Sequence, residues 1–244
     1  MNENTLEKKN CLITGATGGL GRKIAIELAK KNCNLFLTSI EENLEELKQE
    51  LEKLNNGILI KYQHSDLRKV ENVDNLIRKI REEFTSIDIL INSAGENHRK
   101  PLSESTLDEF DSCMNLNVRA PFLLCKEFSK DMVEKKWGRI VNIASSSAHN
   151  GFKNAAIYCS SKHALLGLSR TLFAELKDSN VRTFCVSPGS MKTRMAKEDE
   201  GLLAEHDYNT FMEPSEVAEF ITKIISYDNE MVSQEITLSR LNIN

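Results

Sequence analysis

Residues 14–21 read TGATGGLG, and they follow a short apolar run, CLIT, at residues 11–14. A segment with Leu20, Ile24 and Leu28 at helical spacing comes directly after them. Glycines permit a tight turn and a close backbone approach, and a helix N-terminus offers free N–H groups to an anion. A strand, a glycine-rich turn and a helix in this order predict a phosphate-binding turn that opens a parallel α/β sheet. A glycine-rich turn without a ligand is the alternative interpretation.

The rest of the chain alternates short apolar runs with longer amphipathic segments. Further strands are predicted at residues 34–39, 58–63, 87–91, 139–144, 181–187 and 235–238. Helices are predicted at residues 19–31, 42–55, 66–84, 155–177 and 214–227. Residues 106–136 should form two helices, or one helix bent where Pro121 removes a hydrogen bond.

This alternation predicts the fold class. Strands that alternate with helices require right-handed crossovers and a parallel sheet. We expect an α/β protein with one Rossmann-type, doubly wound parallel sheet of about seven strands and helices on both faces. No stretch rich in Gly, Ser or Pro divides the sequence, so residues 1–244 should form a single domain.

The composition excludes several classes of protein. A formal net charge of -4 gives no electrostatic reason to expect a nucleic-acid partner. The sequence has no run of apolar residues long enough for a membrane span and no secretory signal, so we expect a cytoplasmic protein that does not bind membranes. The six cysteines are scattered and have no His at metal-ligand spacing, which predicts buried, reduced thiols and no metal site.

Tyr158 and Lys162 form the sharpest chemical signal. They lie four residues apart in the predicted helix at 155–177, so their side chains share one face of it. An ammonium group beside a phenol favours the phenolate and moves the phenol pKa from about 10 toward neutral pH. Such a phenol can give a proton to a carbonyl or take one from an alcohol. A Tyr packed on a helix beside a solvated Lys is the alternative.

The spacing of the first turn, T-G-x-x-x-G-x-G, and the Y-x-x-x-K pair resemble the short-chain dehydrogenase/reductase family of classical type. The resemblance extends from Lys9 to Leu238. Within the family, the sequence is similar to members of the 3-oxoacyl-carrier-protein reductase type. It implies an NAD(P)-dependent oxidoreductase that transfers hydride between a nicotinamide cofactor and a carbonyl or secondary alcohol. The C-terminal segment departs from the family, because it lacks the usual T-G and G-G pairs.

The resemblance also implies the catalytic residues. Ser145 directly follows the predicted strand at 139–144 and would hold the substrate oxygen. Tyr158 would exchange the proton, and Lys162 would tune Tyr158 and bind the nicotinamide ribose. Asn117 matches the family residue that supports a proton relay, with Asn115 as its rival in the sequence MNLNV.

The cofactor contacts follow from the same resemblance. Asp66 matches an acid that contacts adenine, although a helix N-cap would also explain it. Ser93 stands where the family's N-N-A-G motif has its second Asn. With Tyr158 and Lys162, the implied contacts are Gly15, Thr17, Gly19, Leu20, Gly21, Ser39, Asp66, Leu67, Asn92, Ala94, Gly95, Pro188, Gly189, Met191 and Thr193.

The choice between NADP and NAD depends on the end of the second strand. An acid there accepts ribose hydroxyls in NAD enzymes and repels the extra phosphate of NADP. The strand ends at Ser39 with no Asp, and we expect Glu41 and Glu42 to begin the next helix, where acids favour the dipole. Arg22 and Lys23 are the candidates for a phosphate contact. The sequence thus favours NADP, with NAD as the alternative.

The substrate side is less defined by the sequence. Residues 190–212 should form a mobile flap, and the charge run Glu198-Asp199-Glu200 in it should be solvated. We expect a small-molecule carbonyl or alcohol substrate. The resemblance implies a homodimer or homotetramer through residues 117–135 and 155–177. The alternatives are a catalytically silent NAD(P)-binding regulator or scaffold, and a sugar-nucleotide epimerase or dehydratase, for whose larger substrate domain the chain has no room.

Overall fold

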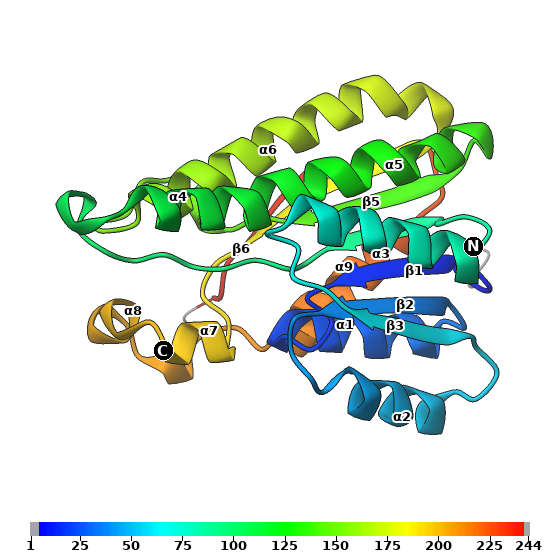
Figure 1. Ribbon diagram of the computed structural model, residues 1–244, viewed down its shortest axis with the longest axis horizontal. Coiled ribbons are helices and arrows are strands. Elements are labelled where there is room, and N and C mark those ends of the chain that lie inside the picture. Colours follow the sequence, from blue (N-terminus) through cyan, green and yellow to red (C-terminus); the bar gives the residue numbers. More distant parts are fainter. Residues whose placement is uncertain (1–4, 242–244) are drawn as a thin grey trace.

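The computed structural model describes residues 5–241 and contains one parallel sheet of seven strands in the order β3-β2-β1-β4-β5-β6-β7 (Figure 1). The strands are β1 Asn10–Thr14, β2 Asn34–Ser39, β3 Ile60–His64, β4 Ile89–Asn92, β5 Gly138–Ile143, β6 Val181–Pro188 and β7 Glu235–Leu238. The chain winds outward from β1 in both directions, so the predicted doubly wound Rossmann-type sheet is confirmed.

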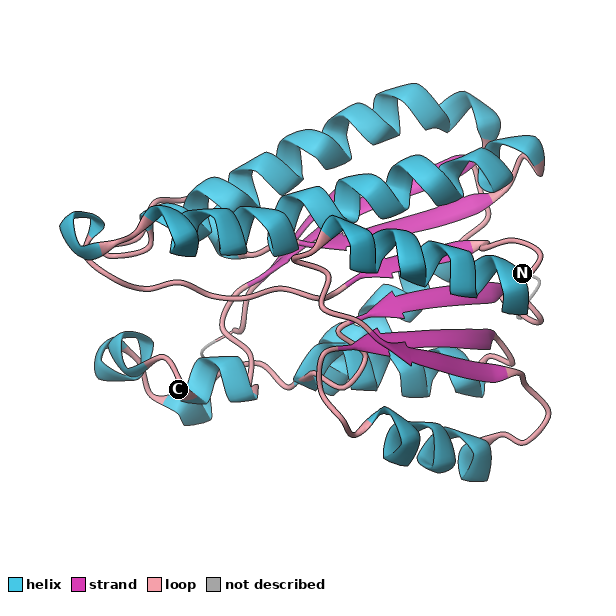
Figure 2. Ribbon diagram, in the orientation of Figure 1, coloured by secondary structure: helices cyan, strands magenta, loops and turns pink. Residues whose placement is uncertain are grey.

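Helices cover both faces of the sheet (Figure 2). They are α1 Gly19–Lys30, α2 Leu44–Leu54, α3 Val70–Glu83, α4 Leu107–Met114, α5 Ala120–Glu134, α6 Ala156–Leu176, α7 Arg194–Lys197, α8 Glu200–Glu205 and α9 Pro214–Ser226. Helices α1, α2 and α9 pack on one face, and α3, α5 and α6 pack on the other. The short helices α7 and α8 lie beyond the carboxyl ends of the strands (Figure 1).

Strand β1 shows why the central strands are apolar without interruption. Cys11 and Ile13 pack in the cluster that contains α1 and α9, whereas Leu12 packs in the cluster that contains α3 and α5. Successive side chains point to opposite faces of a sheet, and both faces here are covered by helices. A continuous apolar run is therefore the pattern of a strand buried on both sides.

Residues 106–136 form two helices that are joined by a π-helical segment, Asn115–Arg119. Thr106 and Glu109 cap α4 reciprocally through their side chains and backbone N–H groups. The alternative of a bend at Pro121 is wrong, because Pro121 lies in the first turn of α5. The irregular turn is the π segment that precedes it, and such segments often occur at functional sites.

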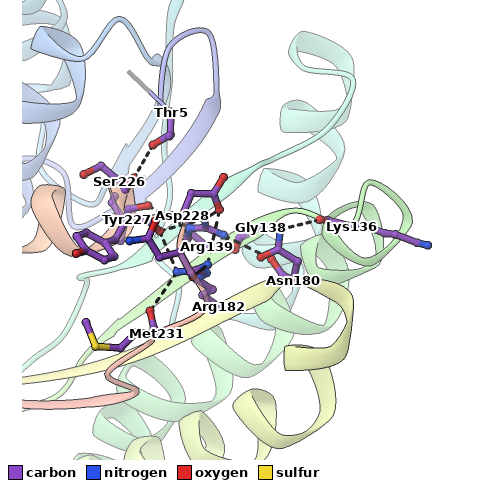
Figure 3. Close-up of polar contacts among 12 residues, drawn as sticks. Thr5, Lys136, Gly138, Arg139, Asn180, Arg182, Ser226, Tyr227, Asp228 and Met231 are labelled. Carbon is purple, nitrogen blue, oxygen red and sulfur yellow. Dashed lines mark hydrogen bonds and ion pairs between the residues drawn. The ribbon is translucent and has the colours of Figure 1, made fainter. Parts of the chain in front are cut away.

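A fully buried arginine ties α9 to the amino-terminal edge of the sheet (Figure 3). Arg139, at the start of β5, donates from Nε to the Ile225 carbonyl at 3.0 Å and from a terminal nitrogen to Asp228 Oδ1 at 2.6 Å. The Trp137 ring lies 4.3 Å from the guanidinium carbon. A buried charge requires partners, and these contacts hold the carboxyl end of α9 and the residues after it against the start of β5.

The predicted state of the cysteines is confirmed, since all six are buried and none forms a disulfide. Within residues 5–241, no cluster of three or more His, Cys, Asp or Glu side chains could hold a metal ion. In the same part of the chain, no helix combines the length and the apolar character needed to cross a membrane.

Candidate active site

The loops that follow the parallel strands meet at one edge of the sheet and line a cavity of about 500 Å³. That volume is in the range of cavities that bind small ligands. Most of the residues implied by the sequence are on its wall: Gly15, Thr17, Gly19, Leu20, Gly21, Ser39, Asp66, Leu67, Ala94, Gly95, Tyr158, Lys162, Met191 and Thr193. The first turn and the Tyr–Lys pair thus belong to a single cavity.

The glycine-rich turn is built for close packing and leaves the start of α1 open. Gly15 has a φ of 62°, a left-handed conformation that favours glycine. A Cβ on Gly21 would lie 2.1 Å from the Gly15 carbonyl oxygen. The N-cap residue Gly18 makes no side-chain hydrogen bond to the first turn of α1, whose N–H groups therefore remain available for an anion. These features fit a bound pyrophosphate.

A polar cluster at the end of β2 lines the cavity beside the first turn. The Thr17 hydroxyl donates to Glu41 Oε2 at 2.8 Å and lies 2.6 Å from Ser39 Oγ. The expectation that Glu41 begins the next helix is wrong, because α2 begins at Leu44. Glu41 lines the cavity instead and forms an ion pair with Arg194.

Asn43 lines this part of the cavity, whereas the predicted phosphate contacts Arg22 and Lys23 do not. The buried Oδ1 of Asn43 finds no hydrogen-bond partner among the residues described. Such an orphaned acceptor fits a ligand that carries hydroxyl or amino groups. The expected phosphate contact through Arg22 is not found, because Arg22 pairs with Glu50 at 2.5 Å on the surface. Lys23 is likewise exposed and lies outside the cavity wall.

Asp66 lies at the cavity beside Arg68. Its Oδ1 accepts from the Arg68 Nε at 2.8 Å and from the Arg68 backbone N–H at 3.1 Å. The N-cap interpretation of Asp66 is wrong, because α3 begins at Val70 and Lys69 is its N-cap residue. The Asp66 carboxylate therefore shapes the loop after β3 rather than the helix.

Three implied cofactor contacts lie outside the cavity wall. Asn92 is buried in the sheet, where its Nδ2 donates to Asn142 Oδ1 on β5 at 2.8 Å. Pro188 is the last residue of β6, and the Gly189 N–H donates to the Leu238 carbonyl at 2.9 Å. These residues fix the strand ends from which the lining loops depart.

The side chains that the resemblance implies to be catalytic lie in the loop after β5 and on α6. Ser145 follows β5, and its hydroxyl forms a hydrogen bond with Tyr158. Lys162 Nζ donates to the Ile143 carbonyl at 2.9 Å and lies 5.6 Å from the centre of the Tyr158 ring. Tyr158 and Lys162 line the cavity, whereas Ser145 lies outside its wall, next in the chain to the lining residue Ala144.

Asn117 lies in the π segment and is almost completely buried. Its Oδ1 accepts from the Glu96 backbone N–H at 3.0 Å, and its Nδ2 donates to the Glu96 carbonyl at 3.0 Å. Nδ2 also donates to Ser161 Oγ on α6 at 3.0 Å. Asn117 thus joins the loop after β4 to the helix that carries Tyr158 and Lys162.

Comparison with known proteins places the chain in a family. Residues 9–201 match the model for short chain dehydrogenases. The chain belongs to the short-chain dehydrogenase family. It is 29% identical over 235 residues to a 3-oxoacyl-[acyl-carrier-protein] reductase of Buchnera aphidicola, covering 96% of this chain and 91% of that protein. Members of the family are NAD(P)-dependent oxidoreductases, and so is this chain.

Solved structures of other dehydrogenases share the fold. The alcohol dehydrogenase of the archaeon Thermococcus sibiricus, complexed with 5-hydroxy-NADP, is 26% identical with a TM-score of 0.86, over 98% of this chain and 99% of that one. 4-Hydroxyisoleucine dehydrogenase complexed with NADH is 28% identical with a TM-score of 0.84, over 96% and 98%. None of these relatives supports the alternative of a silent regulator.

Burial controls the pKa values of the reacting groups in this short-chain dehydrogenase. Burial raises the pKa of Tyr158 to about 12, and the hydrogen bond from Ser145 offsets this rise only in part. Burial lowers the pKa of Lys162 to about 8. The expectation that Lys162 brings the Tyr158 pKa toward neutral pH therefore does not hold here. Tyr158 is a protonated phenol at neutral pH, which suits a proton donor.

The predicted flap, residues 190–212, contains α7 and α8. A hydrogen bond and an ion pair connect it to the loop after β4. Asn97 Nδ2 donates to Asp199 Oδ2 at 2.7 Å, and Arg99 pairs with Glu205 at 2.7 Å. The Asp199 side chain is only 7% exposed, so the expectation of a solvated charge run is wrong at this residue. Its N-capping bond to the Leu202 N–H also holds the start of α8.

Sequence reasoning missed several residues of the cavity wall, among them Glu41, Asn43, Arg68, Glu96 and Arg194. These residues follow predicted strands or cofactor contacts by one to four positions, but the conformations of the loops decide where their side chains point. A signal was present for Glu41, because an acid close behind the second strand is a ribose ligand in NAD enzymes.

Proposed function

We propose that the cavity holds a nicotinamide dinucleotide and that Ser145, Tyr158, Lys162 and Asn117 act on a small carbonyl or alcohol substrate beside it. The reduced dinucleotide supplies a hydride when it is bound. The open start of α1 and the residues around Glu41 and Asp66 would hold its phosphate and adenosine parts.

In this proposal the protein supplies orientation and the proton. The hydroxyls of Ser145 and Tyr158, which are hydrogen-bonded to each other, hold the substrate oxygen between them. Tyr158 gives its phenolic proton to that oxygen during reduction and takes it back during oxidation. The Lys162 ammonium, 5.6 Å from the centre of the ring, would favour the negative charge that forms on Tyr158 during the transfer, while burial keeps the resting phenol protonated. Asn117 fixes the backbone beside Lys162.

One observation carries the proposal. The glycine-rich turn and the Tyr158–Lys162 pair, which are far apart in the sequence, line one and the same cavity. The test is a panel of ketones, aldehydes and alcohols, followed by the absorbance of NADH and NADPH. Turnover of at least one carbonyl supports the proposal. Tight binding of the dinucleotide without turnover of any compound would favour a silent regulator instead.

We propose further that NAD(H) is the preferred dinucleotide, although the sequence favoured NADP. The Glu41 carboxylate lines the cavity beside Thr17 and Ser39. A carboxylate at this place accepts ribose hydroxyls and repels a second phosphate. Glu41 also pairs with Arg194, a cation of the cavity wall that a phosphate could otherwise use.

Glu41→Gln is expected to raise kcat/KM for NADPH relative to NADH by about tenfold, because the substitution removes a repulsive charge and releases Arg194. The matched control is Glu42→Gln, which changes an exposed acid outside the cavity wall. Steady-state kinetics with both cofactors measures the ratio. An unchanged ratio in Glu41→Gln would show that Glu41 does not select the cofactor.

The charge on Lys162 predicts the pH dependence of reduction. With a pKa lowered to about 8, Lys162 is charged below pH 8 and loses its proton above it. Tyr158 stays protonated throughout, since its pKa is about 12. We expect kcat for carbonyl reduction to be level at neutral pH and to fall about tenfold per pH unit well above pH 8. In Lys162→Arg, which keeps its charge, the fall should disappear; a fall of the same shape would exclude Lys162 as its cause.

We also propose that residues 190–212 move as a flap over the substrate, that the protein is cytoplasmic, and that it forms a homodimer or homotetramer. The outer face of α5 exposes Phe122 and Val133, at 48% and 37%, which fits a contact between subunits. Light scattering at the mass of one chain, 27.6 kDa, would contradict the assembly.

A further inference from the structure

Glu96 is held by its backbone against Asn117. The Asn117 side chain bonds both the N–H and the carbonyl of Glu96, each at 3.0 Å. The preceding residue, Gly95, lies between the reacting groups: a Cβ there would be 3.2 Å from Asn117 Oδ1 and 3.5 Å from Lys162 Nζ. A displacement of the Glu96 backbone must therefore displace the groups around Lys162.

The Glu96 carboxylate contacts Ser112 and Arg68, and Arg68 lies beside Asp66, where the adenosine part of the cofactor is proposed to bind. Glu96 Oε1 accepts from Ser112 Oγ at 2.7 Å, and Glu96 Oε2 lies 3.4 Å from a terminal nitrogen of Arg68. Arg68 in turn donates hydrogen bonds to both carboxylate oxygens of Asp66, at 2.8 and 3.3 Å. Glu96, Arg68 and Asp66 all line the cavity.

The chain of contacts continues into the catalytic helix. Asn117 Nδ2 donates to Ser161 Oγ at 3.0 Å, and the Ser161 hydroxyl donates to the Tyr158 carbonyl at 2.8 Å. Polar contacts therefore run without a gap from Asp66 through Arg68, Glu96 and Asn117 to the backbone of Tyr158. The longest of these contacts is the one between Arg68 and Glu96, at 3.4 Å.

We propose that Glu96 is a positioning residue that couples the adenosine end of the cavity to Asn117 and Tyr158. The inference rests on the proposed function. A ligand bound at Asp66 and Arg68 restricts the motion of Arg68, which is the partner of the Glu96 carboxylate. The Glu96 side chain then moves less, and so does the Glu96 backbone, which is hydrogen-bonded to Asn117. Binding energy from the remote end of the cofactor is thereby used to orient the reacting groups.

The first arm of the test does not depend on turnover. ADP-ribose, which carries the adenosine part without nicotinamide, is added to the wild-type protein and to Glu96→Gln, and amide hydrogen exchange is followed. We expect ADP-ribose to slow exchange at residues 113–117 about tenfold in the wild type and to leave it unchanged in Glu96→Gln. Equal protection in both proteins would overturn the coupling. Glu104→Gln, an exposed acid on the nearby turn, is the control and should behave as the wild type.

The second arm separates positioning from a general structural role. Glu96→Gln should lower kcat with the full dinucleotide about tenfold, and leave kcat unchanged with reduced nicotinamide mononucleotide, which lacks the adenosine part. An equal loss with both cofactors would overturn the proposal. If the wild type reduces no carbonyl, the proposed function fails, and the exchange arm still decides the coupling. Arg68→Gln interrupts the same path and replaces Glu96→Gln if that variant does not fold.

Discussion

Tyr158→Phe is expected to lower kcat by about 10²- to 10⁴-fold while the Kd of the dinucleotide changes little. The substitution removes only the phenolic hydroxyl, which is bonded to Ser145 and is the nearest proton to the substrate oxygen in the proposed site. The aromatic ring, which packs at the cavity wall above Lys162, remains. Binding is measured by fluorescence titration and turnover by the loss of NADH or NADPH absorbance.

Tyr62→Phe provides the matched control for the loss of a phenolic hydroxyl. Tyr62 lies on β3, where it stacks edge-on against His64 and bonds to Glu45, outside the cavity. Its turnover should equal that of the wild type. Turnover retained in Tyr158→Phe would mean that another group supplies the proton, and Ser145 would then be the nearest candidate.

The sequence predicted the frame of the fold because each buried strand carries its own signal. The bounds of β2 and β7, Asn34–Ser39 and Glu235–Leu238, coincide with the predicted ones. The gathering of Gly15 and Tyr158 in one cavity follows from the topology, since parallel strands end at the same edge.

The direction of individual side chains could not be predicted. It depends on contacts with residues far away in the sequence, and these contacts can override the preferences of the local sequence. Acids favour the first turn of a helix, and that rule assigned Glu41 to α2, whereas the loop turns its carboxylate toward Thr17. Asn92 resembles a loop residue in the sequence, but its partner is Asn142 on the neighbouring strand. The buried Asp199 carboxylate accepts a hydrogen bond from Asn97, which lies 102 positions earlier. Such pairs become visible only when the chain is folded.

Gly21→Ala is expected to weaken dinucleotide binding by at least about a hundredfold, a loss typical of a misplaced binding group. The added Cβ would lie 2.1 Å from the Gly15 carbonyl oxygen and 2.9 Å from its carbon, and both are backbone atoms that no rotamer change can move. The turn has no room to retreat, because a Cβ on Gly15 would itself lie 2.8 Å from the Ala94 Cα. The start of α1 must therefore shift out of the position that presents its N–H groups to the cavity.

Gly167→Ala makes the same chemical change in the helix α6, where nothing lies within 4 Å of the new Cβ. It should stabilise the protein by up to about 1 kcal/mol and leave binding unchanged, because alanine favours a helix over glycine. Thermal unfolding and fluorescence titration of both variants measure the contrast. Gly19→Ala, whose Cβ would lie 2.8 Å from the movable Thr193 Cγ2 and no nearer than 3.5 Å to any backbone atom of Thr193, should lie between them and replaces Gly21→Ala if that variant does not fold. Close packing at Gly21 places the N-terminus of α1 at the cavity. If Gly21→Ala binds the dinucleotide as tightly as the wild type, the first turn does not hold the phosphates of the dinucleotide.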